Sequence, residues 1–397
     1  ANSPGLLTVD ILEDQTYKRL LEKEVTMEIQ IGPFRQTLLA LKPFVALNPA
    51  IPIAEGKIYL GNGMACATGI EAGVSISCPE AQEPMVLPLI PLLDFLESST
   101  KTAIIQLDHT RGQVSVITSD GAEMTAASPP AEKYPLFKES IPLEQHDVDG
   151  GIFTRQLLEV SSCCDSEDSS RPVLQGVNII MGNQVKLVAA DGFRLMVVTL
   201  PFSLGTNGNI LIPKASVLKL SALWESTPSL TMHISIDKGM MTAKFGQAYF
   251  YTTLIPGTFP DYTKIVPEDN PQVVQFLAED LQIAIKRIGH LSEPYARFQW
   301  ALEDTHDGQL QISCRGDELA SAKLSVPCHV LYRGERQKHF SLEGKVALNL
   351  TYLKQYLHGK MGVITMEVKT RSDAVLFRQS EPPDQVMVVM PMMVRWE

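Results

Sequence analysis

The chain has 397 residues, of which 45% are hydrophobic and 20% charged, a composition typical of globular proteins rather than disordered chains. This length exceeds one ordinary hydrophobic core, so two or three domains are expected. The net charge of −11 argues against a protein that coats nucleic acid over its whole surface, although one basic surface on an otherwise acidic molecule is compatible with it.

Targeting and metal-binding signals are weak in this sequence. No apolar run approaches the roughly 20 residues that cross a bilayer, and residues 1–24 lack the basic and apolar blocks of a signal peptide. We therefore expect a cytoplasmic protein without a membrane partner, with residues 1–24 as an N-terminal extension. The six cysteines show neither Cys-x-x-Cys spacing nor histidine partners at zinc-site spacing, which predicts reduced thiols and no metal site.

The first round of predicted elements begins at residues 27–31, whose alternation indicates a strand. Pro33 suits the first turn of a helix, and Phe34, Leu38 and Leu41 then fall on one helical face. The later segments predict strands with a turn at 62–63, a helix over 88–97, hairpins at 111–112 and 120–121, and a strand over 122–127.

The same order of elements returns twice. In the second round a strand is expected to end near Phe153, followed by a helix containing 157–160 and strands over 174–181, 185–190 and 193–200. Residues 210–213 then lead into a helix over 214–224. The third round predicts helices over 279–291 and 349–357, a strand over 385–390, and an insertion in the basic loop 332–339. Pro88 and Pro213 are 125 residues apart, as are Pro135 and Pro260, which indicates a repeated unit.

A period of this length indicates a repeated domain, because solenoid units run to about 20–50 residues. Each copy combines short strands with two amphipathic helices, which is typical of an α+β fold with helices layered on antiparallel sheets. The predicted copies are domain 1 over 25–148, domain 2 over 149–271 and domain 3 over 272–397.

Three motifs, in order along more than half of the chain, carry a resemblance to a known family. Residues 171–200 contain RPVLQGV and LVAADGFRL, residues 257–267 read GTFPDYTKIVP, and residues 387–392 read MVVMPM. Together they resemble the signature of the bacterial DNA polymerase III β subunit, the sliding clamp family. The resemblance implies an α+β fold of three tandem DNA-clamp domains, with helices on one face and antiparallel sheets on the other. It also implies that two chains close a six-domain ring, with the helices lining its hole.

The function that the resemblance implies is that of a homodimeric DNA sliding clamp. The ring would encircle duplex DNA independently of sequence, after loading by a clamp loader, and tether the DNA polymerase III catalytic subunit and other polymerases for processive synthesis. No catalytic activity and no cofactor are expected. The alternative is a diverged clamp-fold paralogue that acts as a monomeric interaction or regulatory module.

Partners of this family insert a short peptide with apolar anchors into a cleft between the second and third domains. By resemblance the cleft maps here onto Leu174, Gly192, Phe193, Arg194, Leu195, Pro260, Lys264, Ile265, Val388, Met390, Pro391 and Met392. Aliphatic side chains and adaptable methionines suit a pocket that accepts several ligands. Arg194 and Lys264 are expected at its rim, where they could hold acidic or carbonyl groups.

Two further surfaces follow from the resemblance. The DNA-facing candidates are basic residues on the outer faces of predicted helices: Arg35, Lys42, Arg155, Lys214, Lys219, Lys286, Arg287 and Lys354, with Lys360 just beyond the last helix. For any one of these residues an ordinary solvated side chain is the simpler interpretation. The dimer contact would join domain 1 to domain 3 of the partner, at His290, Leu291 and the strand 122–127.

An enzyme is the third hypothesis, and the sequence gives it little support. We find no Gly-x-Ser-x-Gly, phosphate-binding loop or His-Glu-x-x-His motif. The acidic residues 165–168 lack the alternating spacing of a calcium loop and are better explained as a solvated loop.

Overall fold

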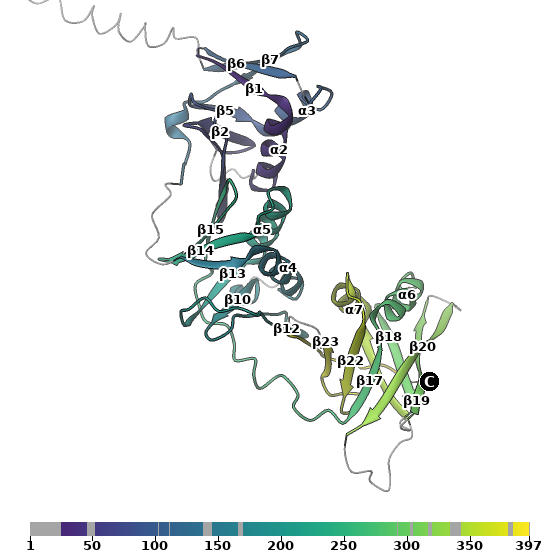
Figure 1. Ribbon diagram of the computed structural model, residues 1–397. Helices are drawn as coiled ribbons and strands as arrows, with labels where there is room; N and C mark the ends of the chain where they lie inside the picture. Colours follow the sequence, from purple (N-terminus) through teal and green to yellow (C-terminus); the bar gives the residue numbers. More distant parts are fainter. Residues whose placement is uncertain are drawn as a thin grey trace, which may run out of the picture. The chain divides into compact units, whose positions relative to one another are not determined.

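A computed structural model describes residues 25–45, 52–101, 103–110, 112–137, 145–165, 170–291, 293–301, 305–316, 320–333, 343–379 and 384–396 (Figure 1). The expected N-terminal extension and most of the basic loop 332–339 lie outside these residues. The chain forms two compact units. Unit 1 comprises Ala1–Gly151 with Leu218–Thr253, and unit 2 comprises Ile152–Val217 with Leu254–Glu397.

Unit 1 contains the first round of elements and part of the second. The first round consists of β1 (Val25–Gln30), α2 (Ile31–Leu41), β2 (Lys57–Gly61), β3 (Met64–Thr68), β4 (Ala72–Ser77), β5 (Met85–Pro88), α3 (Leu89–Phe95), β6 (Ile104–Thr110), β7 (Gln113–Thr118) and β8 (Glu123–Ala127). The second round contributes β9 (His146–Asp149), the end of α5 (Lys214–Ser226), β14 (Thr231–Asp237), β15 (Met240–Phe245) and β16 (Ala248–Thr253). The strands form two sheets, in the orders β1-β6-β7-β8 and β5-β2-β3-β4-β16-β15-β14-β9.

Local sequence explains why the first round folds as predicted. Phe34, Leu38 and Leu41 are all buried along one face of α2, as their spacing requires. The tight turn between β2 and β3 places Asn62 and Gly63 at φ of 55° and 72°, a region that asparagine and glycine adopt at low cost.

Unit 2 contains the rest of the second round and the third. Its elements are α4 (Gly150–Ser161), β10 (Gly176–Met181), β11 (Lys186–Ala190), β12 (Arg194–Thr199), β13 (Gly208–Pro213), β17 (Gln272–Leu277), α6 (Ala278–Ile288), β18 (Tyr295–Ala301), β19 (Thr305–Arg315), β20 (Ser321–Tyr332), β21 (Glu343–Asn349), α7 (Leu350–Leu357), β22 (Val363–Val368), β23 (Val375–Gln379) and β24 (Asp384–Val389). The strands share one sheet, in the order β13-β10-β11-β12-β24-β23-β22-β17-β20-β19-β18-β21. Helices α6 and α7 pack against each other and against its strands (Figure 1). No helix among the described residues is long and apolar enough to cross a membrane.

One predicted boundary is wrong. The strand expected to end near Phe153 is β9, which ends at Asp149, and Phe153 lies in helix α4. Phe153, Leu157 and Val160 are all fully buried, so a helical period governs this segment from its start.

Strands of successive rounds pair by a common rule. The last strand of the second round, β16, pairs antiparallel with β4, the fourth strand of the first round, from Ala72↔Thr252 to Ile76↔Ala248. The last strand of the third round, β24, likewise pairs with β12, the fourth strand of the second round, from Arg194↔Val389 to Thr199↔Asp384. Two strands that would pair by this rule have no such partner within the described part of the chain: β8, the last strand of the first round, and β20, the fourth strand of the third. β8 is the edge strand of its sheet. β17 pairs only with residues 329–332 of β20, so the first two thirds of β20 pair on one side only, with β19.

A buried cation connects the second and third rounds on the helix side. The Lys360 side chain is 6% exposed, and its Nζ donates to Glu159 Oε1 of α4 at 2.5 Å, to Gln379 Oε1 at 3.2 Å, and to Gln385. It also lies 4.7 Å from the centre of the Tyr356 ring. Lys360 is therefore a buried structural residue of this junction. The sequence analysis instead grouped it with exposed basic residues that could face DNA.

Replacing Lys360 should destabilise unit 2, because Glu159 would lose its cation inside the junction. We expect Lys360→Ala to lower the free energy of unfolding by about 3 kcal/mol, measured by urea unfolding followed by tryptophan fluorescence. Lys286→Ala, which removes an exposed lysine of α6, is the matched control and should change it by less than about 0.5 kcal/mol. Equal losses for the two variants would contradict a structural role for Lys360.

All six cysteines are buried and free, as the sequence analysis expected for reduced thiols. Burial raises the pKa of Cys163 to about 11 and that of Cys164 to about 12, and Cys78 and Cys328 also rise to about 11. Since the thiolate is the reactive form, folded protein should present almost no reactive sulfur at neutral pH.

A disulfide reagent such as Ellman's reagent tests this directly. At pH 8 the folded protein should release little colour over minutes, whereas the urea-unfolded protein should react with all six thiols. Rapid reaction of one or more thiols in folded protein would show that the burial of that cysteine is incomplete in solution.

Candidate functional site

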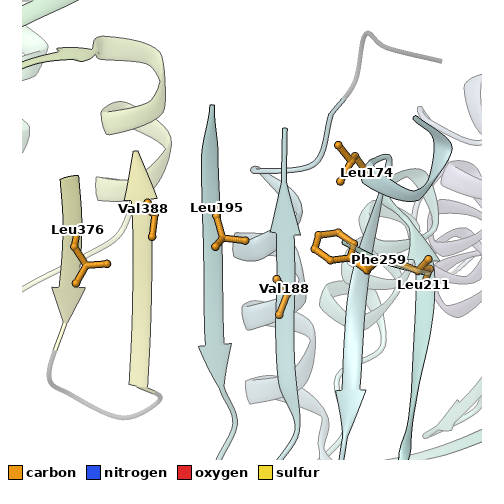
Figure 2. Packing of buried hydrophobic residues seen from close by; sticks show 7 residues of the cluster. All are labelled: Leu174, Val188, Leu195, Leu211, Phe259, Leu376 and Val388. Atoms are coloured by element: carbon orange, nitrogen blue, oxygen red, sulfur yellow. The ribbon is translucent and has the colours of Figure 1, made fainter. Parts of the chain in front are cut away.

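An apolar cluster spans the strands where the second and third rounds meet (Figure 2). Its buried members, which we call the apolar patch, are Leu174, Val188, Leu195, Leu211, Phe259, Leu376 and Val388. Leu195 of β12 lies directly opposite Val388 of β24, as Figure 2 shows on the two neighbouring strands. Partly buried Ala190, Val197 and Val386 extend the patch along the same strands.

The face of the sheet that carries the patch follows from the alternation of side chains along β12. Arg194 points toward α7, where its guanidinium lies 4.2 Å from the centre of the Tyr352 ring. Leu195 must then project from the opposite face, because successive strand residues point to opposite sides. The patch therefore lies on the face away from α7.

The loop between β11 and β12 sits at the edge of the patch. Gly192 has φ of 92°, a conformation that favours glycine. Asp191 Oδ1 accepts hydrogen bonds from the backbone N–H groups of Phe193 and Arg194, both at 2.9 Å. Phe193 is 64% exposed, and its carbonyl accepts a 2.8 Å hydrogen bond from the N–H of Met390, which is 43% exposed. An aromatic and a methionine side chain are thus both exposed at this edge.

Arg194 does not lie at the rim of the expected cleft, where the sequence analysis predicts it. It is only 8% exposed, and its Nε donates to Asp191 Oδ2 at 2.9 Å while its two Nη atoms donate to Gln355 Oε1 and to the carbonyl of Ser162. The guanidinium is therefore committed to groups of the protein itself. Sequence reasoning could not separate Arg194 from Leu195, because the partners of Arg194 lie on distant helices.

The structure places the remaining expected cleft residues in different surroundings. Lys264 is exposed at 87% of its side chain, with Asp261 at 3.8 Å, and Ile265 is also exposed. Gly192 and Pro260 are exposed, and Leu174, Leu195 and Val388 are buried. Pro391 and Met392 are partly buried, and the Met392 N–H donates to the Ala347 carbonyl of β21.

Sequence reasoning missed several members of the patch: Val188, Leu211, Phe259 and Leu376. The signal that could have found two of them is alternation along the strands. Val188 lies two residues before Ala190, and Leu376 lies directly opposite Val388. The position of Phe259 follows from the same Phe-Pro segment that supplied Pro260.

The equivalent surface in unit 1 is covered by its own side chains. Phe137 stacks on Tyr251 of β16 at 4.3 Å between ring centres and on Tyr249 at 6.0 Å. Gly73, opposite Tyr251, leaves room for that ring, since a Cβ there would meet the Tyr251 hydroxyl at 2.4 Å. The β12–β24 pairing has the aliphatic residues Leu195 and Val388 in the corresponding place, and both belong to the apolar patch.

The basic candidates for DNA contact are spread over the helices of both units. Lys42 is exposed and Arg35 half-buried in unit 1, and Arg155, Lys286, Arg287 and Lys354 are exposed and Lys214 half-buried in unit 2. Lys219 lies 6.0 Å from the Phe44 ring, and burial lowers its pKa. The Lys354 Nζ donates to the Gly289 carbonyl after the end of α6, where it interacts favourably with the helix C-terminus.

The expected dimer residues and the acidic loop are partly described. His290 is exposed and Leu291 half-buried just after α6, and β8 has no buried residue. Asp165 is buried and forms an ion pair with Arg171, and 166–168 lie outside the described residues. Within the part of the chain that the structure describes, no group of three or more His, Cys, Asp or Glu could hold a metal ion.

Comparisons with known proteins agree with this architecture. The family model described as the DNA polymerase III beta subunit, central domain, matches residues 152–261. The beta sliding clamp of Haemophilus influenzae is 27% identical over 383 residues, which cover 94% of this chain and 100% of that protein.

Solved structures show the same fold. The DNA polymerase sliding clamp from Bacillus subtilis has a TM-score of 0.82 at 16% identity, and the clamp from Bartonella birtlesii bound to griselimycin has 0.80 at 18%. Each covers 94% of this chain and 100% of the matched chain. In its strand pairing, its three motifs and its length, the chain is similar to the sliding clamps, the bacterial DNA polymerase III β subunits.

Proposed function

We propose that the protein is a DNA sliding clamp: a homodimeric ring that encircles duplex DNA and tethers DNA polymerase III and other partners for processive synthesis. The observation that carries the proposal is the repeated strand pairing, β4 with β16 and β12 with β24, which leaves β8 and most of β20 at sheet edges. An edge strand presents unpaired backbone groups that another chain can satisfy.

A second copy supplies the missing pairs by the same rule. If β8 of one chain pairs with β20 of its partner, and the reverse, two chains make six equivalent junctions and the ring closes. The three copies, with the predicted limits 25–148, 149–271 and 272–397, would then give six domains. His290 and Leu291 lie in the same copy as β20, which supports their assignment to the dimer contact.

The apolar patch is the proposed docking site for partner peptides, including those of polymerases and the clamp loader. Phe193 and Met390 are exposed beside a floor of aliphatic side chains, an arrangement that suits a short peptide with apolar anchors. The Bartonella birtlesii clamp has been solved bound to griselimycin, so this compound can serve as a probe for the proposed site.

Contacts with DNA are proposed for the basic residues on the helices. Lys42, Arg155, Lys286, Arg287 and Lys354 are exposed and can approach phosphates, whereas Lys219 is partly buried against Phe44 and is the weakest candidate. A closed ring needs little affinity, since it leaves DNA only by opening. A cytoplasmic, non-catalytic processivity factor is the corresponding cellular role.

The alternative is a monomeric clamp-fold module that regulates other proteins. Two observations favour it: His290 is polar and exposed at the expected contact, and Pro327 lies in the edge part of β20, where it cannot donate a backbone hydrogen bond. The oligomeric state separates the two functions.

Sedimentation equilibrium of Leu291→Asp tests the dimer contact. The unmodified protein should have twice the chain mass of 43.8 kDa, and the variant, which places a charge in the contact, should have the mass of one chain. Ile283→Asp, a change at an exposed position of α6, should remain dimeric. A dimer that survives Leu291→Asp would exclude this residue from the interface.

Binding of griselimycin to Phe193→Ala tests the patch. Loss of an exposed aromatic contact should weaken binding by about tenfold without affecting folding, measured by isothermal titration calorimetry. Leu230→Ala, which removes another highly exposed apolar side chain, should bind as the unmodified protein does. Unchanged affinity of Phe193→Ala would place the ligand elsewhere.

A further inference from the structure

We infer that Arg194 is a positioning residue that holds the exposed pair Phe193 and Met390 in place from the opposite face of the sheet, without touching a bound peptide. This inference rests on the proposed function of the apolar patch. It assigns to Arg194 a role distinct from binding an acidic group of the ligand.

The first step of the argument is the placement of the guanidinium. Arg194 lies on the α7 side of β12, stacked against Tyr352, while the patch lies on the other side. The side chain is 8% exposed, and all three of its nitrogens donate to protein acceptors. A peptide on the patch would have the sheet between it and the guanidinium.

The second step is the connection from Arg194 to Phe193. The Asp191 carboxylate accepts from the Arg194 guanidinium through Oδ2 and from the N–H groups of Phe193 and Arg194 through Oδ1. The Asp191 N–H donates in turn to the Arg194 carbonyl at 3.2 Å. The Asp191 carboxylate therefore fixes the position of the guanidinium and the conformation of the loop backbone. The loop includes Gly192, whose φ of 92° favours glycine.

The third step is the hydrogen bond that connects the loop to Met390. The Phe193 carbonyl accepts the Met390 N–H at 2.8 Å, just beyond the last residue of β24. The loop of the second round and the chain end of the third therefore share one hydrogen bond at the edge of the patch. Moving the loop would move both exposed side chains together.

The fourth step is the anchorage of Arg194 to the helices. Its guanidinium joins Gln355 and Tyr352 of α7 to the Ser162 carbonyl, just after the end of α4. Removing it would leave the Asp191 carboxylate without its cation, and a nearly buried unpaired charge draws in water or moves toward solvent. The loop would then lose its single conformation, and the cost to binding would not depend on ligand charge.

Ligand charge therefore distinguishes positioning from direct contact. The probes are griselimycin and two short peptides with leucine and phenylalanine anchors, one with aspartate and one with asparagine between them. Arg194→Met should weaken both peptides by the same factor, about tenfold, because the same anchors lose the same preorganised surface. A loss confined to the aspartate peptide, or no loss, would overturn the inference.

Amide hydrogen exchange provides a readout that a simple loss of stability does not reproduce. In Arg194→Met the Phe193 and Met390 amides should exchange faster, while those of Val188 and Val388 in the neighbouring strands keep their protection. Uniform loss of protection across all four amides would indicate general destabilisation and contradict a positioning role.

Gln355→Ala covers the case in which Arg194→Met does not fold. It removes one partner of the guanidinium from an exposed residue of α7, far from any bound peptide, and should weaken both peptides equally, by about twofold to threefold. If the unmodified protein binds none of the probes, the proposed function of the patch fails. If it binds them and both variants bind equally well, the inference about Arg194 fails.

Discussion

Backbone hydrogen bonding between successive rounds is the constraint on which this structure depends. The fourth strand of the first round and that of the second each pair antiparallel with the last strand of the round that follows. The same rule leaves β8 and most of β20 with an unpaired side. Unpaired strand edges of this kind can be satisfied by strands of another chain, which is the physical basis of the proposed dimer.

The junction between β12 and β24 combines two different surfaces. The helix side is polar. There Lys360 forms an ion pair with Glu159, and Arg194 forms one with Asp191 and stacks on Tyr352 of α7. On the other side it is apolar and lined by aliphatic side chains. In unit 1 the corresponding surface is covered by Phe137, whose ring stacks on that of Tyr251.

Much of this could be predicted from the sequence, because period and turn chemistry act locally. The buried face of α2, the Asn62–Gly63 turn and the three-round order all agree with the structure. The strand end predicted near Phe153 is wrong, because α4 follows β9 directly at Gly150 and element boundaries are hard to locate from sequence patterns. Arg194 and Lys360 were misplaced for another reason: their partners lie on helices remote in sequence, and no local pattern reveals on which face of a junction a basic side chain is neutralised.

Retention on DNA of different topology tests the central claim most directly. The protein would be loaded with a clamp loader and ATP onto nicked circular duplex DNA, then separated by gel filtration at high salt, which removes proteins held only by phosphate contacts. A closed ring should stay with the circle and be lost once the DNA is cut to a linear form. Equal loss from circular and linear DNA, under conditions that load a known clamp, would contradict encirclement and favour the monomeric module.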